Sequence, residues 1–566
     1  MCPRRIRAAG SECRMCISAL PALVSCRRAS LPKCSPTQQK AEQRDFRHAV
    51  LSKAINLSYA LLPWTAAFFA VFVLALLVRA YRIGELPFGW HVDEAGMAYD
   101  MYSLIHYGTD RYYKFNPVYF INFGGGQNAL YGYVCAFFMK LFGLSLSVIR
   151  IPAVLSGMVT WLFGTLILRE YFEKKFTLLG SFMIAVLPCF ILQSRIGLES
   201  LLFLSTSTAA LYFMILSVRK EKWWLYGLTG CAFGISLYTY AVSYLVVPIF
   251  LVLMLSYLLY LKKLRWKYVL SMGVPLAILA APLILMIIIN TFELPEIATV
   301  YITIPRLPEY RGSEVSLKNL LHNIPGVVQS FFFKDDRAYN SLDGYFTMYV
   351  VSIPFILLGV QKAAVEAVRT IREKKYTVAA PMLFWLTAQT LMGLLIDEPN
   401  VNKLNGVFFS LLFFAVYGIW YAWKLLQKKK SKTIFLAAVT VAYTCFFVSF
   451  ACYYFGPYTE ETFPLTDFAD CYDDILDEYA DVIGDHNVYV NAKYIYYALG
   501  EKLPPQEMQV IELGEESRGN VYFVHPREVD ENGFYILIGK ESILDELREI
   551  GFTIKNEGFY TVCYKE

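Results

Sequence analysis

Long apolar runs, separated by short polar connectors, dominate most of the chain. A helix needs about 20 predominantly apolar residues to cross a bilayer, and each of these runs comes close to that length. The runs are Trp64–Tyr81, Ile151–Leu168, Phe176–Leu192, Leu201–Val218, Trp223–Tyr240, Tyr244–Leu261, Tyr268–Ile289, Tyr345–Val360, Tyr376–Ile396, Val407–Trp423 and Ile434–Phe455. The pattern predicts an all-α polytopic membrane protein with about 11 transmembrane helices.

Basic side chains gather in alternate connectors. These connectors are 169–175, 219–222, 262–267, 369–375 and 428–432. Because Lys and Arg are enriched in cytoplasmic loops, these connectors and the N-terminus are predicted to face the cytoplasm. The loops 82–150 and 290–344 and the C-terminal part of the chain are then predicted to lie on the outer face.

One apolar run, Ala129–Phe142, is short for a membrane crossing. If it did cross, every later connector would change sides and the charge pattern would no longer hold. We therefore expect this run to form a juxtamembrane or re-entrant helix on the outer surface.

Composition supports the same class and divides the chain into parts. The 566 residues are 56% hydrophobic and 17% charged, which excludes an ordinary soluble protein. The net charge of +5 is unevenly distributed, since 8 Lys and Arg stand against 24 Asp and Glu from Phe455 onward. We attribute this uneven distribution to membrane topology, and we expect no nucleic-acid partner. We expect a disordered, basic, cysteine-containing cytoplasmic tail over 1–55, a transmembrane catalytic domain over 56–455 and an acidic extracytoplasmic domain over 456–566.

The acidic domain has the pattern of a small α/β fold. Helical patterns cover Asp470–Ile483 and Glu541–Ile550, and strand-like runs cover Val488–Val490, Val521–Val524, Tyr535–Ile538 and Phe559–Cys563. The domain offers no catalytic constellation. Acceptor recognition and simple capping of the outer face both remain open as its role.

The candidate chemistry begins just past the first apolar run, where Asp93 and Glu94 stand side by side. Long loops on rigid scaffolds often carry function, so we expect a catalytic loop. Two carboxylates near a low-dielectric boundary tend to raise the pKa of one of them. His91 lies beside the pair, but one histidine and two carboxylates at this spacing do not make a metal site. We expect neither a metal nor a cofactor.

Candidate cations lie in two outer stretches. Just before Leu201, Arg195 and Glu199 would share one face if the segment were helical, either as an intrahelical ion pair or with Arg195 meeting an anionic group. In the first long loop, Arg111 and Lys114 alternate with aromatic side chains, a mixture that suits a sugar phosphate.

A family resemblance rests on an ordered set of motifs. The chain contains HVDEAGMAYDMYSLIHYGTD, NPVYF, an outer amphipathic helix ending in LFG, IRIP, QSRIGLES and GISLYTYAVSYLVVPIF, in that order. From about Trp64 to Trp423 this order resembles the GT-C glycosyltransferases, and within them the protein O-mannosyltransferase and lipid A aminoarabinose transferase group. The acidic pair after the first span is the most specific part of the resemblance.

The resemblance implies an integral-membrane enzyme that moves a monosaccharide from a polyprenyl-phosphate carrier to a protein, lipid or cell-envelope glycan acceptor at the outer face of the cell membrane. Asp93 matches the family's catalytic carboxylate, Glu94 matches its neighbour, and Glu199 falls on an acidic position after the third span. Lys114 lies near a phosphate-binding basic residue, and Lys403 stands where the family pattern has Arg.

These residue types also suit the reaction. Sugar transfer needs a base for the acceptor hydroxyl and cations for the departing phosphate. We predict that Asp93 is the base of an inverting displacement and that Glu94 orients the substrate. The residues predicted to bind substrate or phosphate are Arg195, Glu199, Lys114, Arg111, His91 and Lys403.

A transporter or flippase of a lipid-linked substrate is the rival class. It would place ionisable residues or broken helices near the membrane midplane. The runs Leu201–Val218 and Tyr244–Leu261 contain no charged residue, and charge gathers at the outer face instead. This distribution favours the enzyme.

Overall fold

The computed structural model describes residues 63–310, 315–333, 337, 339–342, 344–458, 468–512, 517–524, 529–539 and 543–565. The tail predicted over 1–55 lies outside these residues. The contacts reported below lie within one unit, Phe68–Glu566.

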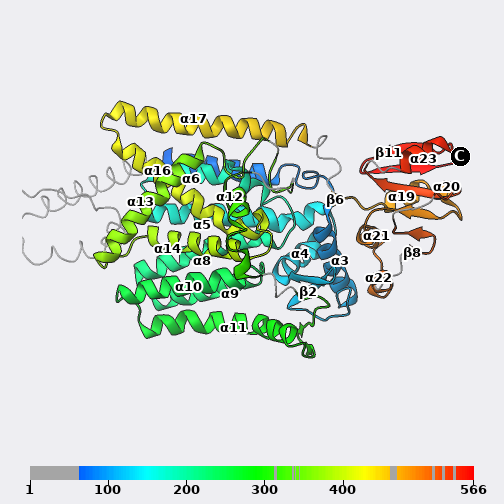
Figure 1. Ribbon diagram of the computed structural model, residues 1–566, viewed down its shortest axis with the longest axis horizontal. Coiled ribbons are helices and arrows are strands. Elements are labelled where there is room, and N and C mark those ends of the chain that lie inside the picture. Colours follow the sequence, from blue (N-terminus) through cyan, green and yellow to red (C-terminus); the bar gives the residue numbers. More distant parts are fainter. Residues whose placement is uncertain are drawn as a thin grey trace, which may run out of the picture. The chain divides into compact units, whose positions relative to one another are not determined.

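Helices lie on all the predicted apolar runs, and Figure 1 shows them side by side in one bundle. The first helix is Pro63–Ala80. The others are α5 (Leu146–Tyr171), α6 (Lys174–Val186) with α7 (Pro188–Leu192), α8 (Ser200–Lys220), α9 (Trp223–Leu237), α10 (Ser243–Tyr260), α11 (Trp266–Thr291), α13 (Ser352–Arg372), α14 (Ala379–Leu395), α15 (Val401–Leu404) with the 3-10 turn η3 (Asn405–Val407) and α16 (Phe408–Leu425), and α17 (Lys429–Tyr454).

By length and composition alone, 7 of the described helices can cross a membrane. They are Pro63–Ala80, α5, α8, α10, α11, the segment Val401–Leu425 and α17. The chain is therefore a multi-pass membrane protein. The segments α6 with α7, α9, α13 and α14 are shorter or carry more charge, so their crossing stays a prediction, as does the side on which each end of the chain lies.

One predicted span has different limits. The run predicted over Tyr345–Val360 corresponds to α13, which begins at Ser352 and continues to Arg372. Arg369 and Arg372 therefore lie in the last turn of a helix, where the prediction had a connector. A basic last turn is favourable because the C-terminal end of a helix carries partial negative charge.

Another predicted span is interrupted. Leu187 is extended between α6 and α7, and Pro188, which opens α7, has no amide hydrogen with which to continue the first helix. Arg79 from the first helix is fully buried and donates to carbonyl oxygens around the break. Its partners are Ile184 at 2.8 Å, Phe190 at 3.1 Å and Ala185 at 3.5 Å. The guanidinium thus satisfies carbonyls that the end of α6 leaves unpaired.

A second buried arginine, Arg195, does the same for the end of the first helix. Its guanidinium donates to carbonyl oxygens at 2.7 to 3.1 Å, those of Val78, Arg79, Tyr81 and Leu86. Its Nε donates to the Tyr454 hydroxyl at 3.0 Å. Arg195 therefore ties the start of the outer segment to the loop before α8 and to the end of α17.

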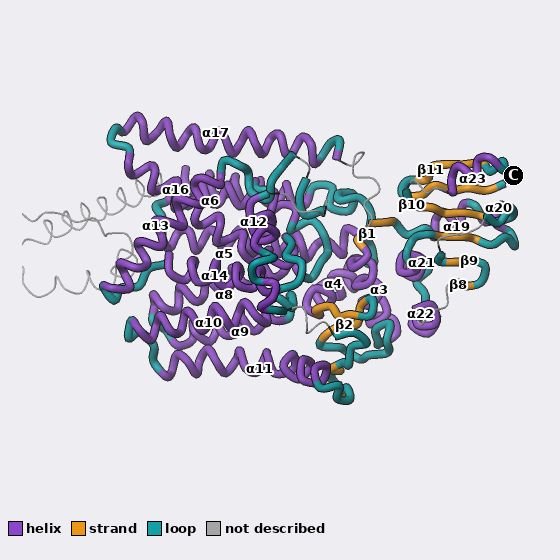
Figure 2. Tube along the Cα trace, in the orientation of Figure 1, coloured by secondary structure: helices purple, strands orange, loops and turns teal. Residues whose placement is uncertain are grey.

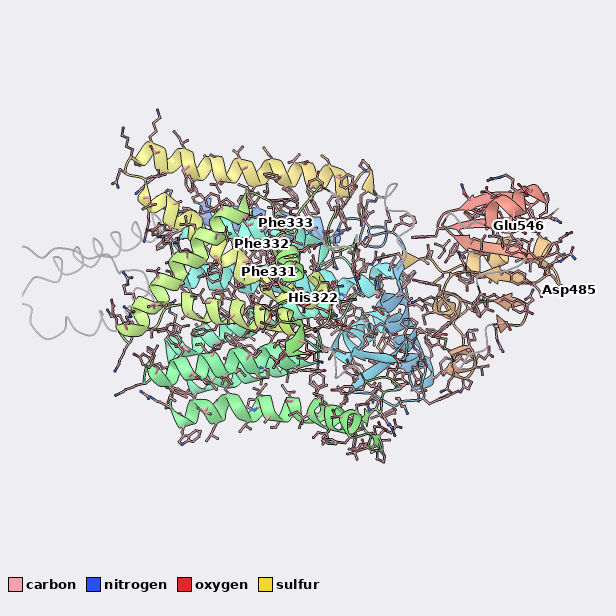
Figure 3. The ribbon with its side chains drawn as sticks, in the orientation of Figure 1. His322, Phe331, Phe332, Phe333, Asp485 and Glu546 are labelled. Carbon is pink, nitrogen blue, oxygen red and sulfur yellow. The ribbon has the colours of Figure 1, made fainter. Side chains whose placement is uncertain are left out.

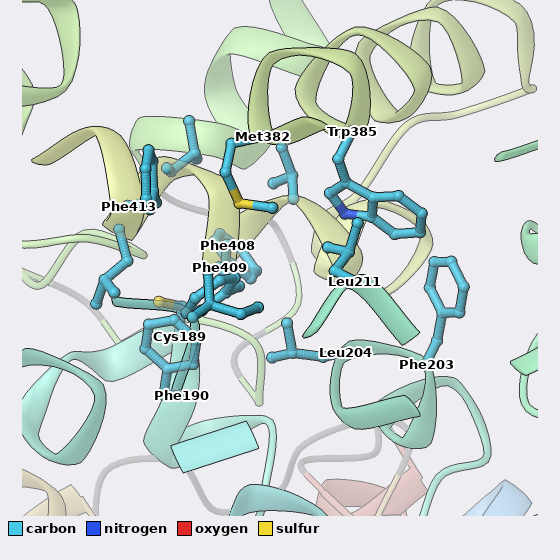
Figure 4. Packing of buried hydrophobic residues seen from close by; sticks show 14 of the residues in the cluster. Cys189, Phe190, Phe203, Leu204, Leu211, Met382, Trp385, Phe408, Phe409 and Phe413 are labelled. Atoms are coloured by element: carbon cyan, nitrogen blue, oxygen red, sulfur yellow. The ribbon is translucent and has the colours of Figure 1, made fainter. Parts of the chain in front are cut away.

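The bundle core surrounds Trp385 of α14, which is fully buried. Its indole nitrogen donates to the Gly406 carbonyl at 2.7 Å, and its ring lies 5.3 Å from Phe250 and 6.0 Å from Phe203. Figure 4 shows Trp385 beside Phe203, with Met382 and Phe408 further along the same layer. This packing fixes α8, α10, α14 and the turn before α16 together, and α10 and α14 also contribute residues to the wall of the cavity described below.

Two glycines let α13 and α16 approach closely. A Cβ added at Gly359 would lie 1.9 Å from the Phe414 carbonyl oxygen, and one added at Gly418 would lie 2.0 Å from that of Phe355. Small residues at a helix contact allow the backbones to meet, which gives dispersion energy that lipid cannot supply.

The outer segment before α5 contains β1 (Trp90–His91), α3 (Val92–Tyr107), a hairpin of β2 (Tyr119–Asn122) and β3 (Gly125–Asn128), and α4 (Ala129–Phe142). The predicted helix Ala129–Phe142 is confirmed with its exact limits. The hairpin was not predicted. Phe123 and Gly124, both with positive φ, form its two-residue turn.

The described part of the second long loop, 290–344, contains β4 (Ile297–Ala298), β5 (Thr303–Ile304), the 3-10 turn η2 (Leu317–Asn319) and α12 (Ile324–Phe332). Asn290, at the end of α11, accepts from the Leu307 amide at 2.7 Å. The Glu309 amide donates to the Gly124 carbonyl at 2.9 Å. These bonds hold this loop against the hairpin.

The C-terminal part is an α/β domain, as predicted (Figure 2). Its mixed sheet has the order β11-β12-β10-β7-β9-β8. The strands are β7 (Val488–Val490), β8 (Ser517–Arg518), β9 (Val521–Tyr522), β10 (Phe534–Ile538), β11 (Thr553–Glu557) and β12 (Tyr560–Tyr564). The short strand β6 (Phe468–Ala469) precedes them, and the helices are α19 (Asp473–Glu478), α20 (Ala480–Ile483), α21 (Tyr494–Gly500), α22 (Pro505–Glu512) and α23 (Ile543–Glu549).

Acidic side chains of this domain lie on its surface. Figure 3 labels two of them, Asp485 before β7 and Glu546 on α23, and both are exposed. The sheet buries apolar side chains on both faces. One face packs on α23 through Tyr535, Leu547 and Phe552.

The other face of the sheet shares a core with the outer segment. This core joins Val488 and Ile536 of the sheet to Met97 of α3 and Tyr131 of α4. The Tyr99 hydroxyl of α3 also donates to the Leu503 carbonyl at 2.8 Å. The helix that carries the acidic pair therefore packs directly on the C-terminal domain.

Candidate functional site

His91 sets the position of Asp93 by capping α3. Its Nδ1 accepts from the Asp93 amide at 3.1 Å, and its own amide donates to Glu94 Oε2 at 2.9 Å. Together these bonds form a capping box, with His91 in the place that Ser or Thr usually takes. The Asp93 side chain is 40% exposed.

Glu94 is fully buried and does not face a substrate. Its two oxygens accept from Arg150 Nε and Nη2, each at 2.8 Å, and it also accepts from the Gly197 amide. Burial alone raises the pKa of Glu94, but the ion pair with Arg150 outweighs burial and the net pKa lies below its ordinary value. The predicted role of Glu94 in orienting the substrate is therefore corrected to a positioning role.

The β2–β3 hairpin brings Asp93 together with a second carboxylate. Asn122, at the end of β2, donates from Nδ2 to Asp93 Oδ1 at 3.0 Å. Gln127 of β3 donates from Nε2 to Glu199 Oε2 at 3.0 Å. One hairpin thus holds Asp93 and Glu199, which lie 106 positions apart in the sequence.

The charge of Asp93 affects the protonation of Glu199. Burial raises the pKa of Glu199 to about 7, and the nearby charge of Asp93 adds to the rise. A raised pKa was expected within the pair Asp93 and Glu94. The raised pKa belongs to Glu199 instead, because Arg150 neutralises Glu94.

Glu199 lines a cavity of about 370 Å³ at the end of the bundle that carries the β2–β3 hairpin. The polar lining residues are Tyr119, Asn128, Glu199, Tyr240, Tyr244, Glu309, Tyr310 and Lys403. Apolar side chains such as Leu245, Met286 and Met392 cover the remaining wall. A concave site with aromatic faces and a few polar groups suits a sugar with a lipid-borne phosphate.

Two predicted phosphate-binding residues do not reach this cavity. Arg195 is fully buried with its guanidinium on backbone carbonyls, and residues 194–198 are not helical, so it forms no helical pair with Glu199. Arg111 is also fully buried, paired with Asp100 at 2.8 Å and donating to the Gly96 carbonyl at 2.6 Å. Both predictions are corrected, because neither guanidinium is left for a donor phosphate.

The two lysines predicted to bind phosphate differ in whether they line the cavity. Lys114 pairs with Glu296 at 2.8 Å, with 22% of its side chain exposed, and does not line the cavity. Lys403 does line it, and its Nζ donates to the Asp397 carbonyl at 2.7 Å. Its amide is capped by Asn400 Oδ1 at 3.0 Å, so the short helix α15 holds the lysine at the cavity wall.

His91 is buried and in edge contact with two rings. Its ring centroid lies 5.1 Å from those of Tyr339 and Phe468. Its Nε2 is buried without a hydrogen-bond partner. The predicted direct contact of His91 with the substrate is therefore corrected to a contact with the Asp93 backbone. Within the described ranges, no group of three or more His, Cys, Asp or Glu residues converges as a metal site.

Several residues of the site were not predicted. Asn122 and Gln127 hold the carboxylates, and Tyr119, Tyr244 and Glu309 line the cavity. The sequence contains one signal for the first two, the glycine-rich stretch Gly124–Gly126 directly after an apolar run, which is typical of a turn. The cavity tyrosines Tyr119 of β2 and Tyr244 of α10 lie far apart in the sequence and have no local signal.

Comparison with known proteins agrees with this architecture. Residues 128–287 match the family model described as dolichyl-phosphate-mannose-protein mannosyltransferase. No curated protein matches the sequence. Among solved structures, ArnT from Cupriavidus metallidurans in the apo state is 12% identical with a TM-score of 0.54, covering 89% of this chain and 98% of its own. The same protein bound to undecaprenyl phosphate has the same identity and coverage, with a TM-score of 0.51. These matches confirm the resemblance in the sequence, and the chain shares the GT-C fold with ArnT.

Proposed function

We propose that this chain is an integral-membrane glycosyltransferase that moves a monosaccharide from a polyprenyl-phosphate carrier to an acceptor hydroxyl at the outer face. The observation that carries the proposal is the single hairpin that binds both Asp93 and Glu199, with Glu199 on the wall of a tyrosine-lined cavity that Lys403 also lines. The fold and the bound undecaprenyl phosphate of the similar ArnT support a lipid-phosphate donor.

Each of the three ionisable groups has a role. Asp93 takes the proton of the acceptor hydroxyl as its oxygen forms a bond to the anomeric carbon. The bond from that carbon to the phosphate oxygen breaks, and polyprenyl phosphate leaves with its charge stabilised by Lys403. Glu199, with a pKa of about 7, is partly protonated at neutral pH and can donate a hydrogen bond to a sugar hydroxyl. Glu94 takes no part in the reaction, because its charge is paired with Arg150.

The distribution of charge disfavours the transporter alternative. Arg79 and Arg195 are fully buried, and their guanidinium groups donate to backbone carbonyls. They therefore offer no binding site for a substrate that would cross the membrane. The titratable cavity residues Glu199, Glu309 and Lys403 lie in or beside outer loops.

The test is transfer from a defined set of donors. Membranes containing the protein are given radiolabelled undecaprenyl-phosphate mannose, glucose or 4-aminoarabinose, and label is followed into protein, lipid and glycan fractions. The proposal predicts transfer from at least one donor. Movement of intact labelled lipid across the membrane without transfer would instead establish the transporter.

Asp93→Asn is the matched variant, because it keeps the size and removes the basicity. We expect a loss of transfer of about 100- to 10,000-fold, with donor binding and melting temperature near those of the wild type. Lys114→Met serves as the control, since Lys114 lies outside the cavity. Near-normal turnover of Asp93→Asn would remove Asp93 from the mechanism.

A further inference from the structure

The C-terminal domain touches the outer segment at the residues that lead into α3. A Cβ added at Gly89, where φ is +70°, would lie 2.4 Å from the Phe559 ring and 2.8 Å from the Ala469 carbonyl oxygen. The rings of Phe88 and Phe559 lie 5.0 Å apart. Only glycine permits both this backbone conformation and this close approach.

Backbone pairing continues the contact up to the histidine that caps α3. Strand β6 pairs antiparallel with β1, with Phe468 opposite His91 and Ala469 opposite Trp90. The Tyr496 hydroxyl, from α21, donates to the Trp90 carbonyl at 3.3 Å. The C-terminal domain thus supplies a second strand to the two residues that precede α3.

The ring of Phe468 completes an aromatic cluster around His91. We call His91, Tyr339 and Phe468 the aromatic clamp; its third ring contact, between Tyr339 and Phe468, has a centroid distance of 5.7 Å. Phe468 is 1% exposed and His91 is 3% exposed. The clamp therefore fixes the plane of the imidazole from two sides.

The orientation of this imidazole reaches Asp93 through one bond. Nδ1 can accept from the Asp93 amide only while the ring keeps its present plane, and the same bond closes the first turn of α3. If the ring turned, the first turn of α3 would lose its cap, and the backbone that carries the Asp93 carboxylate would no longer be held in place. A displacement of about 1 Å at a reacting group can cost about 100-fold in rate.

We propose that the C-terminal domain is a positioning element of the catalytic site, acting through Phe468 and the aromatic clamp on the backbone of Asp93. This proposal rests on the proposed function, in which Asp93 is the base. Phe468 is a positioning residue and touches no reacting atom. The domain is then required for turnover itself, in addition to any contact it makes with an acceptor.

The experiment compares Phe468→Ala with Phe552→Ala in the full-length protein. Phe552 belongs to the same domain and is similarly buried, but it packs on the opposite face of the sheet, against Tyr535. We expect Phe468→Ala to lower kcat by roughly 10- to 100-fold with the donor KM unchanged, and Phe552→Ala to leave kcat within about 3-fold. Phe468→Leu, which keeps the apolar volume beside His91, should restore most of kcat. Transfer is measured with the undecaprenyl-phosphate sugar that the wild type uses.

Amide hydrogen exchange over residues 88–100 provides a readout that needs no turnover. Exchange in this peptide should become faster in Phe468→Ala and stay unchanged in Phe552→Ala. If the wild type transfers no sugar, the proposed function fails, and the exchange data still decide whether the domain orders α3. Equal loss of kcat in both alanine variants, or unchanged exchange in Phe468→Ala, would overturn the positioning role.

Discussion

Lys403 differs from the other predicted phosphate-binding residues in what surrounds it. The guanidinium groups of Arg195 and Arg111 are buried against protein acceptors, whereas Lys403 reaches the cavity wall. Its Nζ donates to a neutral carbonyl oxygen, that of Asp397, at 2.7 Å. A lysine is also a point charge, and it binds phosphate without the two-pronged geometry of the arginine that the family pattern has at this place.

Lys403→Met should therefore raise the donor KM by about 10-fold or more, because a hydrogen bond to a charged group contributes about 1.5 to 3 kcal/mol. Lys114→Met is the matched control and should change the donor KM little. Donor saturation curves for both variants check the assignment. A larger effect at Lys114 than at Lys403 would move the phosphate site to the first outer loop.

Glu199 gives the site a dependence on pH. Its pKa is raised from 4.5 to about 7, so between these values the folded protein holds a proton that the unfolded chain has released. Stability should therefore fall as pH rises through this window, and Glu199→Gln should remove that fall because glutamine stays neutral. Melting temperatures at pH 5 and pH 8 measure the difference. Parallel pH dependence in wild type and variant would show that Glu199 titrates normally.

At the scale of elements, buried arginines replace the usual caps of helix ends. Arg79 binds carbonyls at the break between α6 and α7, and Arg195 binds those at the end of the first helix. A break and a helix end next to an apolar core leave carbonyls that water cannot reach, and each unpaired group costs free energy. The planar guanidinium, with five N–H donors, can pair with several of them at once.

Arg195→Lys should therefore reduce stability without changing the use of the donor. Lysine has three donors and cannot span the carbonyls of Val78 and Leu86 together, so we expect a loss of roughly 2 to 4 kcal/mol in the free energy of unfolding. The control is Arg82→Lys, since Arg82 forms an exposed pair with Glu85. Melting temperature and donor KM are measured together. A raised donor KM at an unchanged melting temperature would return Arg195 to the phosphate site.

At the scale of the whole molecule, the site depends on both long outer loops and on the C-terminal domain lying on one side of the membrane. Loop 82–150 carries Asp93, loop 290–344 carries Glu309, and β6 of the domain pairs with β1. Segments that touch must share a face, so these contacts place the three parts on one side of the membrane. That this side is the outer one stays a prediction from the basic connectors.

Single cysteines test this orientation. In a background without native cysteines, Tyr113→Cys and Glu546→Cys should react with an impermeant thiol reagent from outside, and Lys430→Cys should react only after the membrane is opened. All three positions are exposed, so burial does not limit labelling. Labelling of positions 113 and 546 from opposite sides would mean that the number of crossings between them differs from the prediction.

The sequence by itself determined the class, the helices and the acidic pair. Apolar runs that approach the thickness of a bilayer have few alternatives to helix, because lipid cannot pair with backbone groups. The helix Ala129–Phe142 and four strand-like runs of the C-terminal domain were likewise predictable, since their periodicity is local. Asp93 could be singled out because of its place directly after the first span.

Only the tertiary structure decided which ionisable groups serve the site. Glu94, Arg150, Arg195 and Arg111 have the same residue types as a phosphate or sugar site, and burial with specific partners assigns them to the fold. Glu199 becomes Asp93's neighbour through a hairpin whose two amides reach both carboxylates. The charge state of a carboxylate depends on the distance to other charges and on exclusion of water, and both are properties of packing between segments far apart in the chain.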